Sequence, residues 1–135
     1  MEEETKIMIE QYSKNPLQNF ELKKHTVKQQ EGNFICWDEI VVYLEIENEI
    51  IKNYSFDGNC SNITTAAASF LSEIIINKPI KEVISRNYQT MIDNWFIVSP
   101  RRQRAATIAI LATRNAIHNY LKDKKVDTFD EIIDN

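Results

Sequence analysis

The chain has 135 residues, of which 43% are apolar and 10% aromatic, with only two glycines and three prolines. This composition excludes the disordered and low-complexity classes, and the length suits one hydrophobic core rather than two ordinary domains. The formal net charge of −4 disfavours sequence-independent binding to nucleic acid, which requires a basic face. We therefore expect a single domain over residues 1–135 that does not bind nucleic acid.

Membrane and export signals are missing from the pattern. Every apolar run is far shorter than a membrane span, and the acidic start MEEETK lacks the basic and then apolar layout of a signal peptide. We therefore predict a cytoplasmic protein that does not bind membranes. In that reducing compartment, the two cysteines are not expected to form a structural disulfide.

The first half of the chain predicts one helix followed by strands. Residues 5–12 combine an acidic first turn with helically spaced apolar residues, as in a short helix. Residues 20–27 alternate apolar and polar side chains, which predicts a half-exposed strand. After a turn at Gly32-Asn33, two runs rich in β-branched and aromatic residues flank a predicted hairpin turn at residues 47–49. Three antiparallel strands follow from this pattern.

The second half changes to helical periodicity. Apolar residues predict a helix over residues 63–74, and Pro79 is placed to begin another helix that continues to about residue 96. The longest helix is predicted to have Ser99 as its N-cap and Pro100 as its first residue. Five residues form its apolar stripe: Ala106, Ile110, Thr113, Ile117 and Leu121.

A last short helix is predicted over residues 128–133, capped by Asp127 or Thr128. The sequence contains no internal repeat and no linker. Strands come first and helices second. This order favours an α+β domain in which a three-stranded antiparallel sheet packs against a helical layer.

The common catalytic motifs are missing from this sequence. It has no phosphate-binding glycine loop, no GxSxG nucleophile elbow and no HExxH zinc motif. Neither His25 nor His118 lies in a recognisable catalytic or metal-binding spacing. We therefore expect that the chain is not an enzyme.

Two places could still carry chemistry through a thiol. Cys36 and Asp38 are two residues apart where a strand begins, so their side chains would point to one side of an extended chain. A thiolate and a carboxylate can both bind zinc or iron, although a buried cysteine beside a turn aspartate gives the same pattern. Cys60 precedes a predicted helix, whose dipole would lower the pKa of the thiol unless the residue only fills space there.

A basic cluster lies in the first turn of the predicted long helix, at Arg101, Arg102 and Arg104. The helix dipole favours acidic residues at this end, so the arginines require a negative partner. That partner could be an internal acid such as Asp93, or an acidic protein or anion that docks there. The sequence leaves both interpretations open.

Four segments occur in the order and at nearly the separations of a known family: QYSKNP, GNFICWDEIVVYLEIEN, FDGNCSNITTAAASFLSEIIINKPIKEV and SPRRQRAATIAILATRNAI. They resemble the U-type iron–sulfur cluster scaffolds, which comprise IscU, SufU and the N-terminal domain of NifU. The resemblance extends from about Ile7 to Leu121. It implies an antiparallel three-stranded sheet with helices packed on it, in agreement with the pattern of periodicities.

The resemblance also implies a ligand set, which is incomplete here. Three cysteines and an aspartate hold a [2Fe–2S] cluster or a zinc ion in that family. Cys36 and Asp38 match the first cysteine and the aspartate, but Ser61 matches the second cysteine and Ala105 the third. Alanine cannot bind a metal, and a serine hydroxyl is a poor ligand for iron or zinc at neutral pH. Cys60 could supply a third donor through a local backbone shift.

Other family positions are also changed. The residue before the third cysteine position, Lys or His in relatives, is Arg104 here. The loop that chaperones read in IscU keeps only Pro100, followed by Arg101 and Arg102. The resemblance therefore marks Pro100, Arg101 and Arg102 as candidates for contact with a partner.

The resemblance implies three hypotheses for function. The first is a scaffold-like protein in iron–sulfur assembly that binds iron, zinc or a labile [2Fe–2S] cluster through Cys36, Asp38 and Cys60. The second is a paralogue that binds no metal or cofactor and regulates or pairs with a true scaffold or a cysteine desulfurase. The third is a sulfur acceptor that carries a persulfide on Cys36. In each case the expected partner is a cysteine desulfurase or another iron–sulfur assembly protein.

Overall fold

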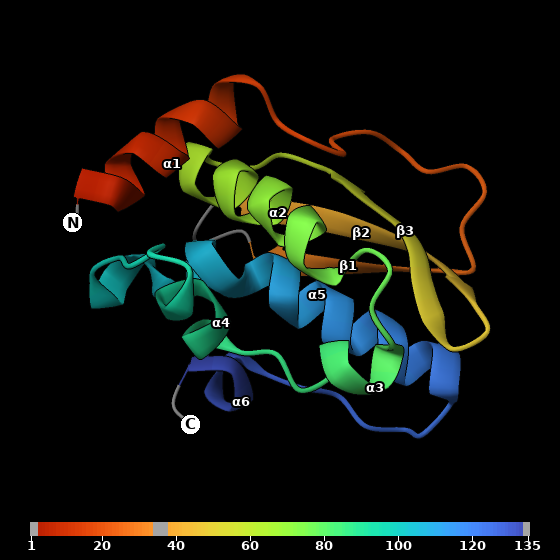
Figure 1. The fold of residues 1–135 in the computed structure, drawn as a ribbon. Helices are drawn as coiled ribbons and strands as arrows, with labels where there is room; N and C mark the ends of the chain where they lie inside the picture. Colours follow the sequence, from red (N-terminus) through yellow and green to blue (C-terminus); the bar gives the residue numbers. More distant parts are fainter. Residues whose placement is uncertain (1–2, 34–37, 134–135) are drawn as a thin grey trace.

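The structure is a computed structural model, and it describes residues 3–33 and 38–133. Figure 1 shows the elements in chain order: α1 (Glu3–Lys14), β1 (Val27–Asn33), β2 (Asp38–Glu47), β3 (Ile50–Asp57), α2 (Asn62–Ile75), α3 (Ile80–Val83), α4 (Tyr88–Asp93), the 3-10 helix η1 (Pro100–Arg102), α5 (Gln103–Leu121) and α6 (Phe129–Ile133). Within these described residues, every helix is too short or too polar to cross a membrane.

The three strands form one antiparallel sheet in the order β1-β2-β3, which confirms the predicted fold class. The predicted hairpin turn joins β2 to β3, with positive φ angles of 54° at Asn48 and 63° at Glu49. Positive φ at both central residues matches the right-handed twist of the paired strands. Alternate residues of the central strand β2 point into the core: Ile40, Val42, Leu44 and Ile46.

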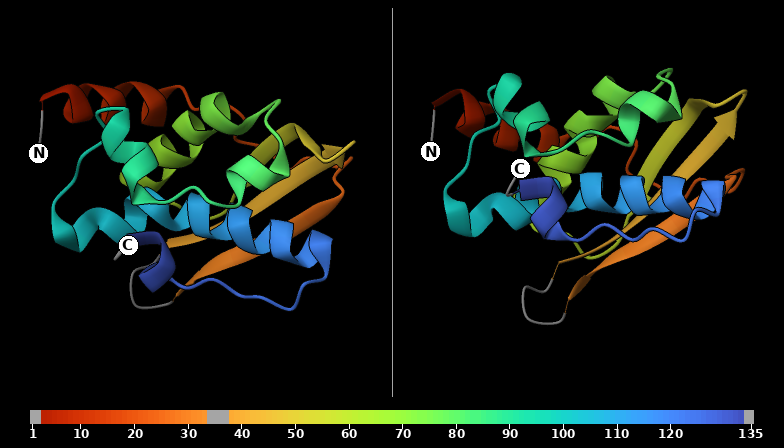
Figure 2. Two further views of the ribbon diagram at one scale, coloured as in Figure 1. Left: turned by 60° about the horizontal axis from the view of Figure 1, so that its bottom comes forward. Right: turned by 90° about the horizontal axis from the view of Figure 1, so that it is seen from below.

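Helices α2 and α5 cover one face of the sheet, as the two views in Figure 2 show. Helix α5 packs on β1 and β2, and α2 packs on β3 and on α5. The central turns of α2 carry small buried residues, so α2 can approach α5 closely: Ala66, Ala67, Ala68 and Ser69. Buried side chains from the sheet and from both helices form one hydrophobic cluster, which fixes the end of the sheet relative to the start of each helix.

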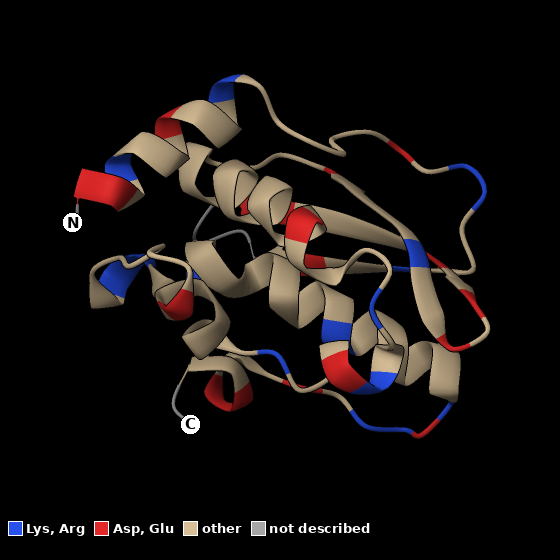
Figure 3. Ribbon diagram, viewed as in Figure 1, with Lys and Arg blue, Asp and Glu red and all other residues tan. Residues whose placement is uncertain are grey.

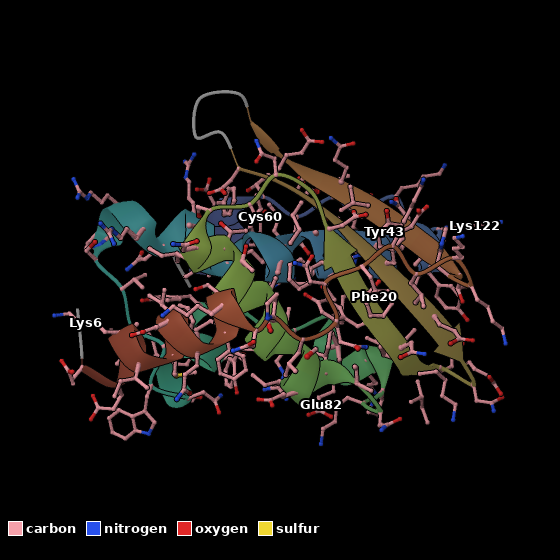
Figure 4. All side chains as sticks on the ribbon, turned by 90° about the horizontal axis from the view of Figure 1, so that it is seen from above. Lys6, Phe20, Tyr43, Cys60, Glu82 and Lys122 are labelled. Atoms are coloured by element: carbon pink, nitrogen blue, oxygen red, sulfur yellow. The ribbon has the colours of Figure 1, made fainter. Side chains whose placement is uncertain are left out.

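The predicted strand over residues 20–27 is wrong, since only Val27 of that range belongs to β1. The segment between α1 and β1 instead crosses the face of the sheet opposite the helices, where the rings of His25 and Tyr43 lie 5.4 Å apart (Figure 4). Phe20 is 46% exposed, so its place in the apolar alternation does not reflect burial against the sheet.

Strand β1 has the polar sequence VKQQEGN, so a prediction based on apolar residues did not find it. Polar side chains of α5 cover it. Asn119 Nδ2 donates to Gln29 Oε1 at 2.6 Å, and Asn115 Nδ2 donates to Glu31 Oε2 at 2.9 Å. Side-chain hydrogen bonds therefore replace the apolar contacts on which the prediction depended.

The predicted helix over residues 79–96 is divided into α3 and α4. Pro79 is the N-cap of α3 rather than its first residue, and Asn87 interrupts the helix and caps α4 with its side chain. Pro100 begins the next helical segment as predicted, but it is the first residue of η1, and Ser99 precedes η1 without a side-chain cap hydrogen bond. Helix α5 then continues directly from η1.

Four residues of the predicted α5 stripe are buried, but Leu121 is 45% exposed at the last turn of the helix. The helix ends at Lys122, which adopts a left-handed conformation with φ of 57°. The loop that follows leads to α6, where Thr128 Oγ1 accepts a hydrogen bond from the backbone N–H of Asp130 at 3.3 Å. Of the two caps predicted for this helix, Thr128 makes the contact.

Candidate functional site

A cavity of about 280 Å³ lies where the sheet meets the first turns of α2 and α5. Polar residues from three segments line it: Asp38, Ser61, Arg101, Arg102 and Arg104. We call the three arginines the arginine cluster. Gly32 and four apolar side chains line the rest of its described surface, and we call the four side chains the apolar wall: Ile63, Ala105, Ile108 and Phe129. The cavity therefore combines a charged part with an apolar part.

Asp38 and Ser61 are joined by two hydrogen bonds at this cavity. Asp38 is 8% exposed, and its Oδ1 accepts from the backbone N–H of Ser61 at 2.6 Å. Its Oδ2 accepts from Ser61 Oγ at 3.2 Å. Ser61 is also the N-cap of α2 and accepts from the backbone N–H of Thr64 at 3.3 Å. Asp38 thereby compensates the positive end of the α2 dipole.

The loop before Ser61 depends on a glycine. Gly58 has a φ of 122°, and a Cβ atom at this position would lie 2.3 Å from the carbonyl oxygen of Glu39. This close approach lets the backbone N–H of Glu39 donate to the carbonyl oxygen of Asn59 at 3.0 Å. A side chain at Gly58 would disturb that contact, so the glycine determines how the loop lies against β2.

Cys60 faces this backbone contact rather than the cavity. Its Sγ donates to the Glu39 carbonyl oxygen at 3.4 Å, and it packs against the edge of the core. Figure 4 shows Cys60 in the loop that leads into α2, and Cys60 does not line the described part of the cavity. A role of Cys60 as a ligand would require its sulfur to leave the Glu39 carbonyl, and that role stays a prediction.

The expected lowering of the Cys60 pKa by the helix dipole is wrong. Burial of the thiol, together with the negative charges of Asp38, Asp57 and Glu39, raises its pKa to about 12. Both causes disfavour a thiolate. The interpretation of Cys60 as a small residue that fills space fits these surroundings.

Cys36 lies outside the described residues, together with the neighbouring Trp37. Its predicted role as a ligand or sulfur acceptor therefore stays a prediction. Within residues 3–33 and 38–133, no group of three or more histidine, cysteine, aspartate or glutamate side chains is placed to hold a metal ion. In the described part of the cavity, Asp38 is the one carboxylate that could bind a cation.

The arginine cluster makes no ion pair with any described residue, which contradicts one of the two interpretations, that of an internal ion pair with an acid such as Asp93. Asp93 instead accepts from Gln89 Nε2 at 2.8 Å. The guanidinium of Arg104 lies 5.2 Å from the centre of the Phe129 ring. Such a cation–π contact orients an arginine but leaves its charge without an acidic partner. Figure 3 shows the basic segment between α4 and α5.

Sequence reasoning missed the contribution of α6 to this site. Phe129 lies 24 residues after Ala105 in the sequence, beyond the segments that resemble the family, and it still lines the same cavity. Its neighbours Thr128 and Asp130 have no motif spacing. No signal in the sequence could have placed Phe129 beside Arg104, because a loop of irregular structure sets the position of α6.

The family model for the NifU-like N terminal domain matches residues 3–127. The chain belongs to this family. A curated relative, the iron–sulfur cluster assembly scaffold protein IscU of Thermotoga maritima, is 37% identical over 60 residues, which are 44% of this NifU-like chain and 42% of that protein. The matched region thus spans less than half the length of that relative.

Solved structures share the fold of this NifU-like domain. A putative iron–sulfur cluster assembly scaffold protein for the SUF system from Fervidobacterium islandicum aligns with a TM-score of 0.72 at 20% identity, over 82% of this chain and 93% of that chain. The N-terminal part of a nitrogen-fixing NifU-like protein from Brucella abortus aligns with a TM-score of 0.69 at 13% identity, over 86% and 93% of the two chains.

The positions that the family resemblance marked lie together in the fold. Asp38, Ser61, Arg104 and Ala105 all line the one cavity, although they come from β2, the α2 cap and α5. Pro100 begins η1 immediately beside them. The cavity of this NifU-like domain therefore lies where the resemblance placed a metal or cluster site, with different side chains around it.

Proposed function

We propose that this NifU-like domain acts in iron–sulfur cluster assembly as a scaffold-like protein. Iron, zinc or a labile [2Fe–2S] cluster would be its cargo rather than a resident cofactor. The family match over residues 3–127 is the observation that carries this function. The relatives from T. maritima and F. islandicum, whose names describe scaffold proteins of iron–sulfur cluster assembly, support it. The domain would hold and hand on its cargo and would not be an enzyme.

The residues at the cavity favour weak retention of that cargo. A closed zinc site takes four ligands, and [2Fe–2S] clusters in proteins are held by four side chains. Here Cys36 and Asp38 are the candidate donors, while Ser61 and Ala105 occupy the other family positions. Both oxygens of Asp38 accept hydrogen bonds from Ser61, which a bound metal would have to displace in part.

The proposed partner is a cysteine desulfurase or another iron–sulfur assembly protein. Arg101 and Arg102 line the cavity, and Pro100 precedes them in η1. All three residues are exposed or half-exposed, so a partner could reach both them and the cargo. Exchange of Arg101 and Arg102 for glutamate should weaken capture of an acidic partner. Undiminished capture would show that the two arginines do not contribute to the interface.

A second candidate function is a binding module without metal or cofactor. The hydrogen bonds of Ser61 to both carboxylate oxygens of Asp38 favour it, because they satisfy that carboxylate without any ion.

A persulfide on Cys36 is compatible with either candidate. Incubation with a desulfurase and cysteine, followed by mass spectrometry, should add one sulfur to Cys36, and an unmodified thiol would count against that role.

The scaffold proposal is tested by anaerobic reconstitution of the wild type and two matched variants, Cys36→Ser and Cys60→Ser, with ferrous iron and sulfide. Each variant removes one thiol. The wild type should develop thiolate-to-iron absorption, and Cys36→Ser should lose it. If Cys60→Ser keeps the absorption, Cys60 serves packing; if it loses the absorption, Cys60 is a ligand. No absorption in the wild type would leave the module without metal as the better account.

A further inference from the structure

We propose that the cavity binds a small organic anion, with a carboxylate or phosphate held by the arginine cluster and an apolar part held against the apolar wall. This binding goes beyond scaffold function, because it requires neither Cys36 nor a metal. The proposed ligand is a small molecule inside the cavity, whereas the proposed protein partner would bind at the rim.

The arginine cluster has charges that the described structure does not compensate. Arg101, Arg102 and Arg104 lie at the N-terminal ends of η1 and α5, where the helix dipole disfavours cations, and the first turn of α5 has no acidic residue. No described side chain forms an ion pair with them. By contrast, Arg86 pairs with Glu82 at 2.8 Å and Arg114 pairs with Asp127 at 2.8 Å.

Asp38 does not neutralise the cluster, although it lines the same cavity. Both of its oxygens accept hydrogen bonds from Ser61, at 2.6 and 3.2 Å, and it forms no ion pair with an arginine. Three guanidinium groups and one carboxylate leave an excess of two positive charges on the described lining. A guanidinium presents a planar fork of donors that matches carboxylate and phosphate oxygens, so an oxyanion is the ligand that this charge favours.

The shape and the apolar wall favour an organic anion over an inorganic one. The volume of about 280 Å³ lies just below the range of roughly 300–1,000 Å³ that is usual for small-molecule sites. The half-buried side chains of Ile63 and Phe129 would stay in contact with water if a bare phosphate ion occupied the charged part alone. An aromatic or aliphatic group beside the anionic head would cover them and gain from burial.

Titration calorimetry on metal-free protein at constant ionic strength tests this binding with three probes: benzoate, phenyl phosphate and inorganic phosphate. At least one organic probe should bind roughly tenfold or more tightly than inorganic phosphate, because burial of an apolar ring adds to the charge-assisted hydrogen bonds. Comparison of benzoate with phenyl phosphate distinguishes a carboxylate ligand from a phosphate ester. Absence of binding by all three probes overturns the proposal and leaves an acidic protein partner as the reason for the cluster.

Two triple variants separate the cavity from general charge. Exchange of Arg101, Arg102 and Arg104 for glutamine should weaken binding about tenfold or more, since it removes every charge-assisted donor. Exchange of Lys122, Lys124 and Lys125 for glutamine removes the same charge from the loop after α5 and should change binding by less than about twofold. Equal losses in both variants, or no loss in the arginine variant, overturn the proposal. Circular dichroism verifies that both variants fold.

Discussion

The charged side chains at the two ends of helix α5 differ in whether they form ion pairs. At the N-terminal end, the arginine cluster has no ion-pair partner among the described residues. At the C-terminal end, Arg114 and His118 are both bound to carboxylates of the loop that follows the helix. Unpaired charges thus lie beside the cavity, in η1 and the first turn of α5, and paired charges lie toward the other end of α5.

Asp127 is the centre of the paired end. Its Oδ2 accepts from Arg114 Nε at 2.8 Å and lies 2.9 Å from His118 Nε2. The other ring nitrogen of His118, Nδ1, lies 2.8 Å from Asp123 Oδ2. Asn115 accepts from the backbone N–H of Asp127 at 2.7 Å and donates to its carbonyl oxygen at 3.1 Å. We call this set of contacts the Asp127 network, and it holds the loop before α6 on α5.

The difference between the ends shows what each contributes. Buried charges stabilise a fold only when they are paired and hydrogen-bonded, which the Asp127 network achieves. Exposed cations beside a helix N-terminus contribute little to stability, so a role in binding accounts better for their presence. The Asp127 network positions α6, and α6 supplies Phe129 to the cavity. The ion pairs at the C-terminal end of α5 therefore help to form the cavity beside its N-terminal end.

The largest expected effect comes from breaking the paired end. Asp127→Ala leaves Arg114 and His118 without their shared acceptor, so it should lower the free energy of unfolding by about 3 kcal/mol. Arg101→Gln, which removes a charge from the other end, should change it by less than about 0.5 kcal/mol. Urea unfolding of both variants measures the difference. Equal losses would show that the two ends are not distinct.

The next effect concerns the backbone beneath the cavity. Gly58→Ala introduces a Cβ that would lie 2.3 Å from the Glu39 carbonyl oxygen, at a φ of 122°. The free energy of unfolding should fall by about 2 kcal/mol, because the loop must move or accept strain. Asn59→Ala, in the same exposed loop, is the control and should cost little. A stable Gly58→Ala variant would mean that the loop does not lie as closely against β2 as described.

A smaller effect is expected at the helix cap that joins Asp38 to α2. Ser61→Ala removes the acceptor for the Thr64 N–H and one donor to Asp38, and should lower the free energy of unfolding by about 1 kcal/mol. Ser61→Thr, which keeps a hydroxyl, should lose less. If thermal unfolding shows the two variants to be equal, the side-chain hydroxyl does not cap α2.

The smallest effect at neutral pH concerns Cys60, tested in a Cys36→Ser background. A thiol with a pKa of about 12 stays protonated when folded, while the unfolded thiol ionises near pH 9. Since thiolate reacts with iodoacetamide, alkylation at pH 8 should be at least about tenfold slower in the folded protein than in urea. Equal rates would contradict the raised pKa.

The same pKa has a consequence for stability at high pH. The folded state keeps the Cys60 proton that the unfolded state releases above about pH 9, so the unfolded state gains relative stability as the pH rises. The contribution of Cys60 is therefore complete below pH 9 and is lost between pH 9 and about 12. A Cys60→Ser variant should lack this decline, and an identical decline in the variant would assign it to other groups.

Much of the fold was predictable because its elements follow local rules. The Asn48-Glu49 hairpin, helix α2 and the Ser99-Pro100 start carry their signals within a few residues. Strand β1 was missed because polar residues of α5 cover it, and a single sequence does not show which polar residues meet. The turn at Asn87 divided a helix whose apolar spacing continues across it.

The site was predictable only in part, for a related reason. Asp38, Ser61 and Ala105 were found because the family resemblance marks their positions, and the structure places all three around the cavity. The Asp127 network was not found, because His118 and its two acids follow no recognised motif spacing. Pairing that forms only when a loop folds back on a helix leaves no periodic signal.

Iron bound per chain, measured after anaerobic reconstitution and desalting, tests the central claim most directly. We predict that the wild type retains iron above the level of Cys36→Ser and loses it to a millimolar chelator, as expected for cargo held by an incomplete ligand set. Iron in the wild type no higher than in Cys36→Ser would contradict a scaffold-like function for this domain.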